Sequence, residues 1–248
     1  MENLSYEKDE LICYNNTDIM ITNISGRQEA KKPALLVAVC VIAANCALFA
    51  AELDIRAEKL IYLNKGETVE FRENVRFSKE GFRGNAAYLK LSKEKKDVYA
   101  TGSVYSIFKS TSSKWVELWA EELNYNEESD ILSSSMRSKF IIHISTTAGL
   151  ETSYEIVCAS FYGFVAKQNF YLTGKPVIIK GDDISGASDF LVFSGEVIDM
   201  KGNASLNYGK ERPYEASAEF IRIDLNDDRV DFTKSVKGVF YAGNSDSK

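Results

Sequence analysis

Apolar and polar side chains alternate along most of the chain after Leu53, and this alternation predicts β-strands. In residues 69–77 the apolar positions that share one face are Val69, Phe71, Val75 and Phe77. The other face carries Glu70, Arg72, Asn74 and Arg76. Glu73 falls on the apolar side and interrupts the period, which predicts a bulge. The pattern is typical of a strand with one buried face.

The same period returns at Ala87, Leu89 and Leu91, and again in residues 98–104, 220–225 and 230–232. Turn signals rich in Gly, Asn and Asp separate these segments at roughly ten-residue spacing, which is typical of a sandwich, barrel or roll of short antiparallel strands. The chain has only three prolines, and no sustained apolar helical stripe follows Ala51. The predicted fold class is all-β.

Residues 74–91 are echoed at a constant offset by residues 176–193. The matched pairs are Val75 with Val177, Phe77 with Ile179, Phe82 with Ile184, Gly84 with Gly186 and Leu91 with Phe193. Any two hairpins share a binary pattern, but five coincident positions that include a glycine favour a true repeat. Repeated strand–turn–strand units must stack to bury their apolar faces. A second echo is an alanine–glutamate pair, interpreted as the opening of a strand, at Ala57–Glu58, Ala120–Glu121 and Ala218–Glu219.

The N-terminal part of the chain has a different character. Residues 33–51 contain no charge, follow Lys31 and Lys32, and precede Glu52. As a helix rising ~1.5 Å per residue, this run is long enough to cross a membrane, and the charges around it direct the rest of the chain outwards. It is therefore predicted to be either a cleaved signal peptide or a retained single anchor. Residues 1–32 are interpreted as a disordered extension or as sequence upstream of a start at Met20, and residues 52–248 as the folded domain.

Charge and cysteine content exclude several classes of function. The net charge is −6 and no basic stripe runs along the folded part, which disfavours nucleic-acid binding. Three of the four cysteines, Cys13, Cys40 and Cys46, lie in or before the apolar run, so Cys158 has no partner for a disulfide within the folded part. The paired cysteines of a zinc site are absent from the sequence, and no cofactor is predicted.

Candidate catalytic groups are sparse. The single histidine, His143, lies in a β-like run and is interpreted as a surface or satisfied core residue. Asp182, Asp183 and Asp189 could form a calcium or glycosidase site, although a solvated turn is the favoured interpretation. Trp115 and Trp119 are predicted to line the core or a groove, with a sugar-stacking platform as the alternative. We therefore expect a protein that is not an enzyme.

The repeat resembles the OstA-like domain of the periplasmic lipopolysaccharide-transport family, in its soluble LptA-like or membrane-anchored LptC-like form. The matching pieces are residues 73–77, 172–179, 181–186 and 100–104. The resemblance covers most of residues 52–248 and is weakest across residues 126–165, which fit no repeat.

This resemblance implies an elongated, open β-jellyroll of repeated units whose apolar interior shields lipid acyl chains. The side chains implied to line that groove are Val69, Phe71, Val75, Phe77, Leu89, Leu91, Val177, Ile179, Leu191 and Phe193. The implied ligand is lipopolysaccharide. The implied partners are other OstA-like domains joined by edge-strand pairing, the inner-membrane export complex, the outer-membrane assembly and further copies of the chain, head to tail.

The expected location is the periplasm, with or without a tether to the inner membrane through residues 33–51. Two alternatives of other classes remain open. One is a secreted β-roll that binds or cleaves polysaccharide, and the other is an assembly protein that uses only its edges and has a solid interior.

Overall fold

The computed structural model describes residues 5–15, 18–21, 53–79, 81–109, 113–145, 151–209, 214–227 and 229–240. These residues form an all-β protein with a single-turn 3-10 helix, η1 (Asn64–Gly66). The strands are β1 (Ser5–Asn15), β2 (Asp18–Ile21), β3 (Leu53–Leu63), β4 (Thr68–Lys79), β5 (Phe82–Ser92), β6 (Asp97–Lys109), β7 (Lys114–Asn126), β8 (Ile131–Ser134), β9 (Ser138–Ser145), β10 (Glu151–Cys158), β11 (Ser160–Phe164), β12 (Asn169–Lys180), β13 (Ile184–Ser194), β14 (Val197–Tyr208), β15 (Tyr214–Asp224), β16 (Arg229–Thr233) and β17 (Lys237–Phe240).

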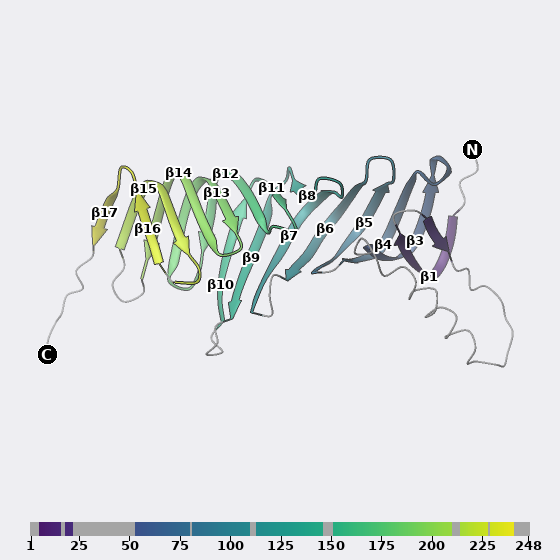
Figure 1. Cartoon of the computed structure of the whole chain (residues 1–248), viewed down its shortest axis with the longest axis horizontal. Helices are drawn as coiled ribbons and strands as arrows, with labels where there is room; N and C mark the ends of the chain where they lie inside the picture. Colours follow the sequence, from purple (N-terminus) through teal and green to yellow (C-terminus); the bar gives the residue numbers. More distant parts are fainter. Residues whose placement is uncertain are drawn as a thin grey trace.

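The described strands belong to one 17-stranded sheet, in which sequence neighbours pair antiparallel. They lie side by side along the long axis, so the molecule is elongated and its two ends are far apart (Figure 1). An antiparallel sheet built by hairpins needs only short connections, which the regular turn signals supply. The predicted all-β fold is confirmed.

Several long strands bend sharply in the middle. In β4, β6 and β14 the pairing register shifts at residues 73–74, 102–103 and 202–203, where the strand carries one more residue than its neighbours. Both residues at each of these points have a positive φ, for example 67° at Glu73 and 85° at Gly102. Such bulges bend a strand. The bulge expected at Glu73 is confirmed.

The bends divide each long strand into two arms, which we call the upper arm and the lower arm after their positions in Figure 1. The upper arm runs from the bends to turns such as residues 93–96, and the lower arm runs to turns such as residues 181–183. Within each arm, neighbouring strands are joined by backbone hydrogen bonds. The bends form the corner at which the two arms meet. The result is an open roll with a V-shaped cross-section.

The alanine–glutamate pairs lie at this corner, in the middle of their strands. The prediction that they open a strand is therefore wrong. Ala120–Glu121 faces the bulge of β6, and Ala218–Glu219 faces the bulge of β14. The alanine is small enough to fit where the arms converge, and Ala120 and Ala218 are buried. At the equivalent place in β3, the Glu58 carboxylate accepts a hydrogen bond from the Asn74 amide. The pair therefore marks a corner of the roll.

The repeat is visible in the structure as two similar three-stranded units, β4–β6 (the first copy) and β12–β14 (the second copy). Val75 and Val177 are both fully buried, as are Leu89 and Leu191. Gly84 and Gly186 occupy the same crowded place. A Cβ on Gly84 would lie 2.5 Å from the Phe77 ring, and one on Gly186 would lie 2.6 Å from the Ser205 carbonyl oxygen.

Residues 126–165, which fit no repeat, form the centre of the molecule. Here β8 and β9 together occupy one strand position beside β7, and β10 and β11 occupy the next. The break between β8 and β9 has no left-handed bulge. Instead, the hydroxyls of the buried Ser134 and Ser138 both donate to the Met136 carbonyl oxygen. The corner is therefore made by side-chain hydrogen bonds, which a search for glycine-based repeats does not detect.

The predicted N-terminal extension contains β1 and β2, which pair with each other, and β1 also pairs with β3. The apolar run of residues 33–51 lies outside the described residues. In the part of the chain that the structure describes, no helix is long and apolar enough to cross a membrane. The division of the chain at residues 32 and 51 stays a prediction.

Candidate functional site: the apolar interior between the arms

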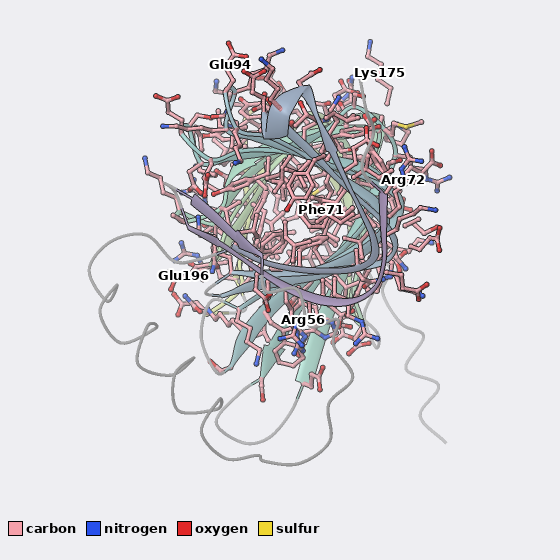
Figure 2. The ribbon with its side chains drawn as sticks, turned by 90° about the vertical axis from the view of Figure 1, so that its right-hand side faces the viewer. Arg56, Phe71, Arg72, Glu94, Lys175 and Glu196 are labelled. Carbon is pink, nitrogen blue, oxygen red and sulfur yellow. The ribbon has the colours of Figure 1, made fainter. Side chains whose placement is uncertain are left out.

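Every side chain predicted to line the groove lies in the interior of the roll. Those in the upper arm are Val69, Phe71, Leu89, Leu91, Leu191 and Phe193, and those in the lower arm are Val75, Phe77, Val177 and Ile179. None is more than 6% exposed. In the view along the roll, Phe71 lies between the strands of the two arms, while Arg72, Glu94, Lys175 and Glu196 lie on the outside of the roll (Figure 2). The structure therefore brings these residues together in one apolar layer, as strand alternation requires.

Seven phenylalanines of this interior have rings that lie close to one another in succession, and they form what we call the phenylalanine spine. They are Phe77, Phe82, Phe108, Phe140, Phe161, Phe170 and Phe193. The spine crosses between the arms at Phe108 and Phe170, whose ring centroids are 5.7 Å apart, and at Phe140 and Phe161, 4.9 Å apart. Aromatic rings bury large apolar areas and dominate the energetics of a core. The interior is therefore filled by side chains that could also pack against an acyl chain.

The roll is closed at the corner and open on the opposite side. Among the described residues, every strand pairing joins neighbours within one arm, and no ladder joins the turn ends of the upper arm to those of the lower arm. Two polar contacts of the described residues span the open side. Lys114 Nζ at the lower end of β7 donates a hydrogen bond to Asn226 Oδ1 beyond β15. Lys79 Nζ at the lower end of β4 lies 3.9 Å from Glu127 Oε1 in the upper turn after β7. The arms can therefore separate on this side without the loss of backbone hydrogen bonds.

Few polar side chains reach the interior. Ser106 and Ser188 are buried, and the Ser188 hydroxyl donates to the Phe190 carbonyl oxygen. The Cys158 thiol lies 3.7 Å from the Ser138 carbonyl oxygen, and burial raises the pKa of the thiol to about 12. A thiol with such a pKa stays protonated and unreactive at neutral pH. This space suits hydrocarbon rather than a polar substrate.

Trp115 and Trp119 do not line the interior, contrary to the sequence-based prediction. The interior side of β7 is formed by Val116 and Leu118, and both tryptophans lie half-buried on the outer face beside Glu117. Trp115 stacks on His143 with ring centroids 4.6 Å apart, and the Lys139 ammonium lies 4.6 Å from the Trp119 centroid. Alternation alone could not orient a strand with large apolar side chains on both faces.

His143 lies on the same outer face between two glutamates. Its Nδ1 lies 3.0 Å from Glu151 Oε1 and forms a hydrogen bond. Its Nε2 lies 3.1 Å from Glu117 Oε1, but the two are not aligned for a hydrogen bond. The Tyr105 hydroxyl also donates to Glu117, and burial, together with this hydrogen bond, raises the pKa of Tyr105. The histidine is therefore a partnered surface residue, as expected.

The three aspartates that could have formed a calcium or glycosidase site do not meet. Asp182 and Asp183 are exposed in the turn between β12 and β13. Asp189 lies at the corner of β13, where its carboxylate accepts a hydrogen bond of 2.7 Å from Asn203. Among the described residues, no group of three or more His, Cys, Asp or Glu side chains could hold a metal ion. The polysaccharide hypothesis loses the carboxylate cluster on which it depended.

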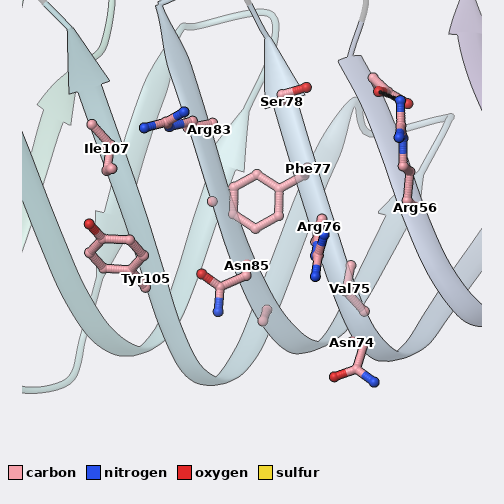
Figure 3. Close-up of a pocket in the computed structure, with 13 residues that line it drawn as sticks. Arg56, Asn74, Val75, Arg76, Phe77, Ser78, Arg83, Asn85, Tyr105 and Ile107 are labelled. Carbon is pink, nitrogen blue, oxygen red and sulfur yellow. Dashed lines mark ion pairs between the residues drawn. The ribbon is translucent and has the colours of Figure 1, made fainter.

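Sequence reasoning missed a second feature, which we call the arginine hollow. It is a depression of about 640 Å³ on the outer face of the lower arm, over β3 to β6 (Figure 3). Its charged lining residues are Asp54, Arg56, Arg76 and Arg83. The outward positions of these arginines follow from alternation, but their assembly depends on the register between three strands. No signal along a single strand gives that register.

The C-terminal end of the roll exposes an edge. Both β16 and β17 pair with β15, and the described residues provide no strand on their other side. Val236 and Val239 at this edge are 53% and 54% exposed. An edge with free backbone groups and exposed apolar side chains is a template for the addition of another strand.

No family model matches the sequence, and no curated protein matches it. Among solved structures, the chain is similar to the crystal structure of LptH, the LptA-homologous periplasmic component of the lipopolysaccharide transport device from Pseudomonas aeruginosa. The two are 9% identical, the match covers 77% of this chain and 95% of that one, and the TM-score is 0.26. At this identity and TM-score, the likeness says nothing about what this chain binds.

Proposed function

We propose that this chain is a periplasmic lipid-transport protein that shields the acyl chains of lipopolysaccharide between its two arms. The observation that carries the proposal is the continuous apolar interior, which extends along the roll and opens on one side. A lipid that crosses water needs such a surface, because exposure of each CH₂ group costs about 0.8 kcal/mol. The resemblance of the repeat to the OstA-like domain supports the same assignment.

Because side chains fill the interior, an acyl chain enters only if the arms move apart. The left-handed bulges are suited to act as hinges, since a small rotation there changes the angle between two rigid ladders. Contacts across the spine, such as the contact between Phe108 and Phe170, are then replaced by contacts with the lipid. One apolar contact replaces another, so loading and release need no chemical step.

The chain is also proposed to bridge components of the inner and outer membranes, through the exposed edge at β16 and β17. We propose that an OstA-like domain of a partner adds a strand there, as in β-augmentation, so that the interiors of successive domains join into one path. Further copies of the chain, an inner-membrane export complex and an outer-membrane assembly are the proposed neighbours. Whether residues 33–51 are cleaved, as in an LptA-like protein, or tether the domain, as in an LptC-like one, is tested by the mass of the mature N-terminus.

The proposal is tested by photo-cross-linking to lipopolysaccharide from probes at Phe77 and at Ile179. The matched control is a probe at Ile178, because successive strand residues point to opposite faces and Ile178 is exposed on the outer face. We expect cross-links from the two interior positions and none from Ile178. Equal yields from Ile178 and Ile179, or no interior cross-link, would contradict the proposal.

A second experiment tests whether the arms must separate. Cysteines placed at Lys114 and Asn226 are joined by a short, cleavable bis-maleimide, in a background with serine at Cys13, Cys40 and Cys46. Cys158 stays unmodified because its thiol is buried and its pKa is raised. Lipid loading should be lost when the linker closes the open side and should return when the linker is cleaved. Unchanged loading in the linked protein would rule out entry between the arms.

A further inference from the structure

The arginine hollow lies on the opposite face of the sheet from the apolar interior. Arg56, Arg76 and Arg83 come from the neighbouring strands β3, β4 and β5, and all three side chains are exposed. Val75 and Phe77, whose side chains are buried in the interior, also line the hollow (Figure 3). Arg76 lies between them in β4, so its side chain points to the other face of the sheet, away from the proposed lipid path.

The sheet register sets like charges against each other in this hollow. Arg56 is directly opposite Arg76 in the pairing of β3 with β4. On the next strand, Asn85 is opposite Arg76, and Arg83 is opposite Ser78. Like charges at directly opposed positions destabilise a sheet. The fold therefore keeps an arrangement that its own stability does not favour.

The hollow is positive within a chain of net charge −6. Its one acidic lining residue, Asp54, lies 3.3 Å from Arg56. In the part of the chain that the structure describes, no ion pair involves Arg76 or Arg83. Two guanidinium groups thus remain available, with the Asn85 amide and the Ser78 hydroxyl beside them.

The second copy of the repeat serves as an internal control for what the fold requires. At the equivalent outer positions, Arg76 is replaced by Ile178, Arg83 by Ser185 and Asn85 by Ala187. The interior positions between them keep the same apolar character in both copies. The second copy forms the same arrangement of strands without arginine at these positions. The fold therefore does not require the arginines of the first copy.

From this geometry we propose that the arginine hollow binds a phosphate group, carried by a lipid headgroup or free in solution. Guanidinium groups present forked donors that match two phosphate oxygens, and charge-assisted hydrogen bonds of this kind are the strong ones. The Asn85 amide and the Ser78 hydroxyl can donate further hydrogen bonds to the anion. Asp54 is the one carboxylate among the lining residues, and it is paired with Arg56. The long arginine side chains can close over the anion from two strands.

The test uses the full chain and a variant that carries both Arg76→Gln and Arg83→Gln. The control variant, Lys180→Gln with Lys201→Gln, removes the same charge from exposed positions of the second copy. Binding is measured by calorimetry with inorganic phosphate, and by flotation with phosphatidylcholine vesicles that contain or lack phosphatidylglycerol. We expect the arginine variant to bind about tenfold more weakly and the control to stay within about twofold of the unmodified chain, with weaker binding at high salt.

Each outcome decides the proposal. Binding of phosphatidylglycerol vesicles alone supports a lipid-borne phosphate, and binding of inorganic phosphate supports a free one. Equal losses of affinity in the arginine and lysine variants would show that net charge alone causes the binding, and this result would overturn the proposal. The proposal would also be overturned if the unmodified chain bound neither inorganic phosphate nor the vesicles. Interior cross-linking at Phe77 and Ile179 should be unchanged in the arginine variant, so this proposal and the proposed function can fail separately.

Discussion

The first and second copies of the repeat agree inside the roll and differ outside it. Leu89 and Leu191 are fully buried at equivalent positions, and Val75 matches Val177. On the outer face of the upper arm, the first copy carries a charged cluster in which Arg72 donates a hydrogen bond of 2.7 Å to Glu70. The second copy has aromatic rings in the same area, with Tyr171 and Phe190 6.3 Å apart.

This difference separates two kinds of constraint. An interior side chain contacts both arms, so its size and polarity are fixed by packing at near-crystalline density. An outer side chain contacts only its neighbours on one sheet and water, so it is free to serve another purpose. Outer residues that differ between the copies, such as Arg76 and Ile178, are therefore where function specific to one copy should be sought.

The largest effect should come from the matched interior leucines. Leu89→Ala and Leu191→Ala each remove a fully buried side chain, and each should lower the free energy of unfolding by about 2–5 kcal/mol. Because one apolar cluster connects the copies, both variants should shift a single transition. Urea unfolding followed by circular dichroism measures this. Two separate transitions, one per copy, would show that the copies are not one cooperative unit.

A smaller and unequal effect is expected at the corner glycines. Gly102 and Gly202 have φ angles of 85° and 71°, and an L side chain there costs about 1–2 kcal/mol. A Cβ on Gly102 would also lie 2.6 Å from the Ala87 Cβ, whereas one on Gly202 would lie 3.1 Å from the Asp189 carboxylate, which can move. We expect Gly102→Ala to cost about 2–4 kcal/mol and Gly202→Ala about 1–2 kcal/mol.

Thermal unfolding of the two alanine variants measures this difference. Ala87→Gly with Gly102→Ala tests the reason for it, because removal of the Ala87 Cβ removes the contact at 2.6 Å. The double variant should then lose less stability than the sum of its two single changes. Equal costs for Gly102→Ala and Gly202→Ala would show that backbone conformation alone sets the effect.

The smallest effect is a pH dependence that belongs to the first copy. Burial opposes ionisation of Glu70, but hydrogen bonds from Arg72 and Tyr88, with the charge of Arg72, outweigh it and lower the pKa of Glu70. A carboxyl with a lowered folded pKa adds stability above its unfolded pKa, and that stability is lost as the pH falls through the folded pKa. Glu70→Gln should therefore flatten the decline of the unfolding free energy below about pH 4.5.

The comparison between copies supplies the control for this pH effect. Tyr171 occupies the position of Glu70 in the second copy, so the second copy has no carboxyl group there. Tyr171→Phe should leave the acid limb of the stability profile unchanged. If Glu70→Gln also leaves it unchanged, the cluster with Arg72 and Tyr88 does not contribute to acid stability.

Much of the fold was predictable because strand alternation is a local property. The buried face of β4 and the bulge at Glu73 follow from the order of apolar residues alone. The repeat was visible because both copies keep the same interior chemistry. The face of Trp115 and Trp119 was predicted wrongly, since β7 carries large apolar side chains on both sides and its parity is set by contacts with β6 and β9.

By itself, the sequence determined that the chain is β, where most strands turn, and which side chains are apolar enough to face inwards. Only the tertiary structure decided that the alanine–glutamate pairs form corners, that the strands bend into two arms, and that Arg56 meets Arg76 on the outer face. The physical reason is that alternation has a period of two residues within one strand. Corners and surface sites depend on the register between strands, which bulges and neighbouring ladders fix only in the assembled sheet.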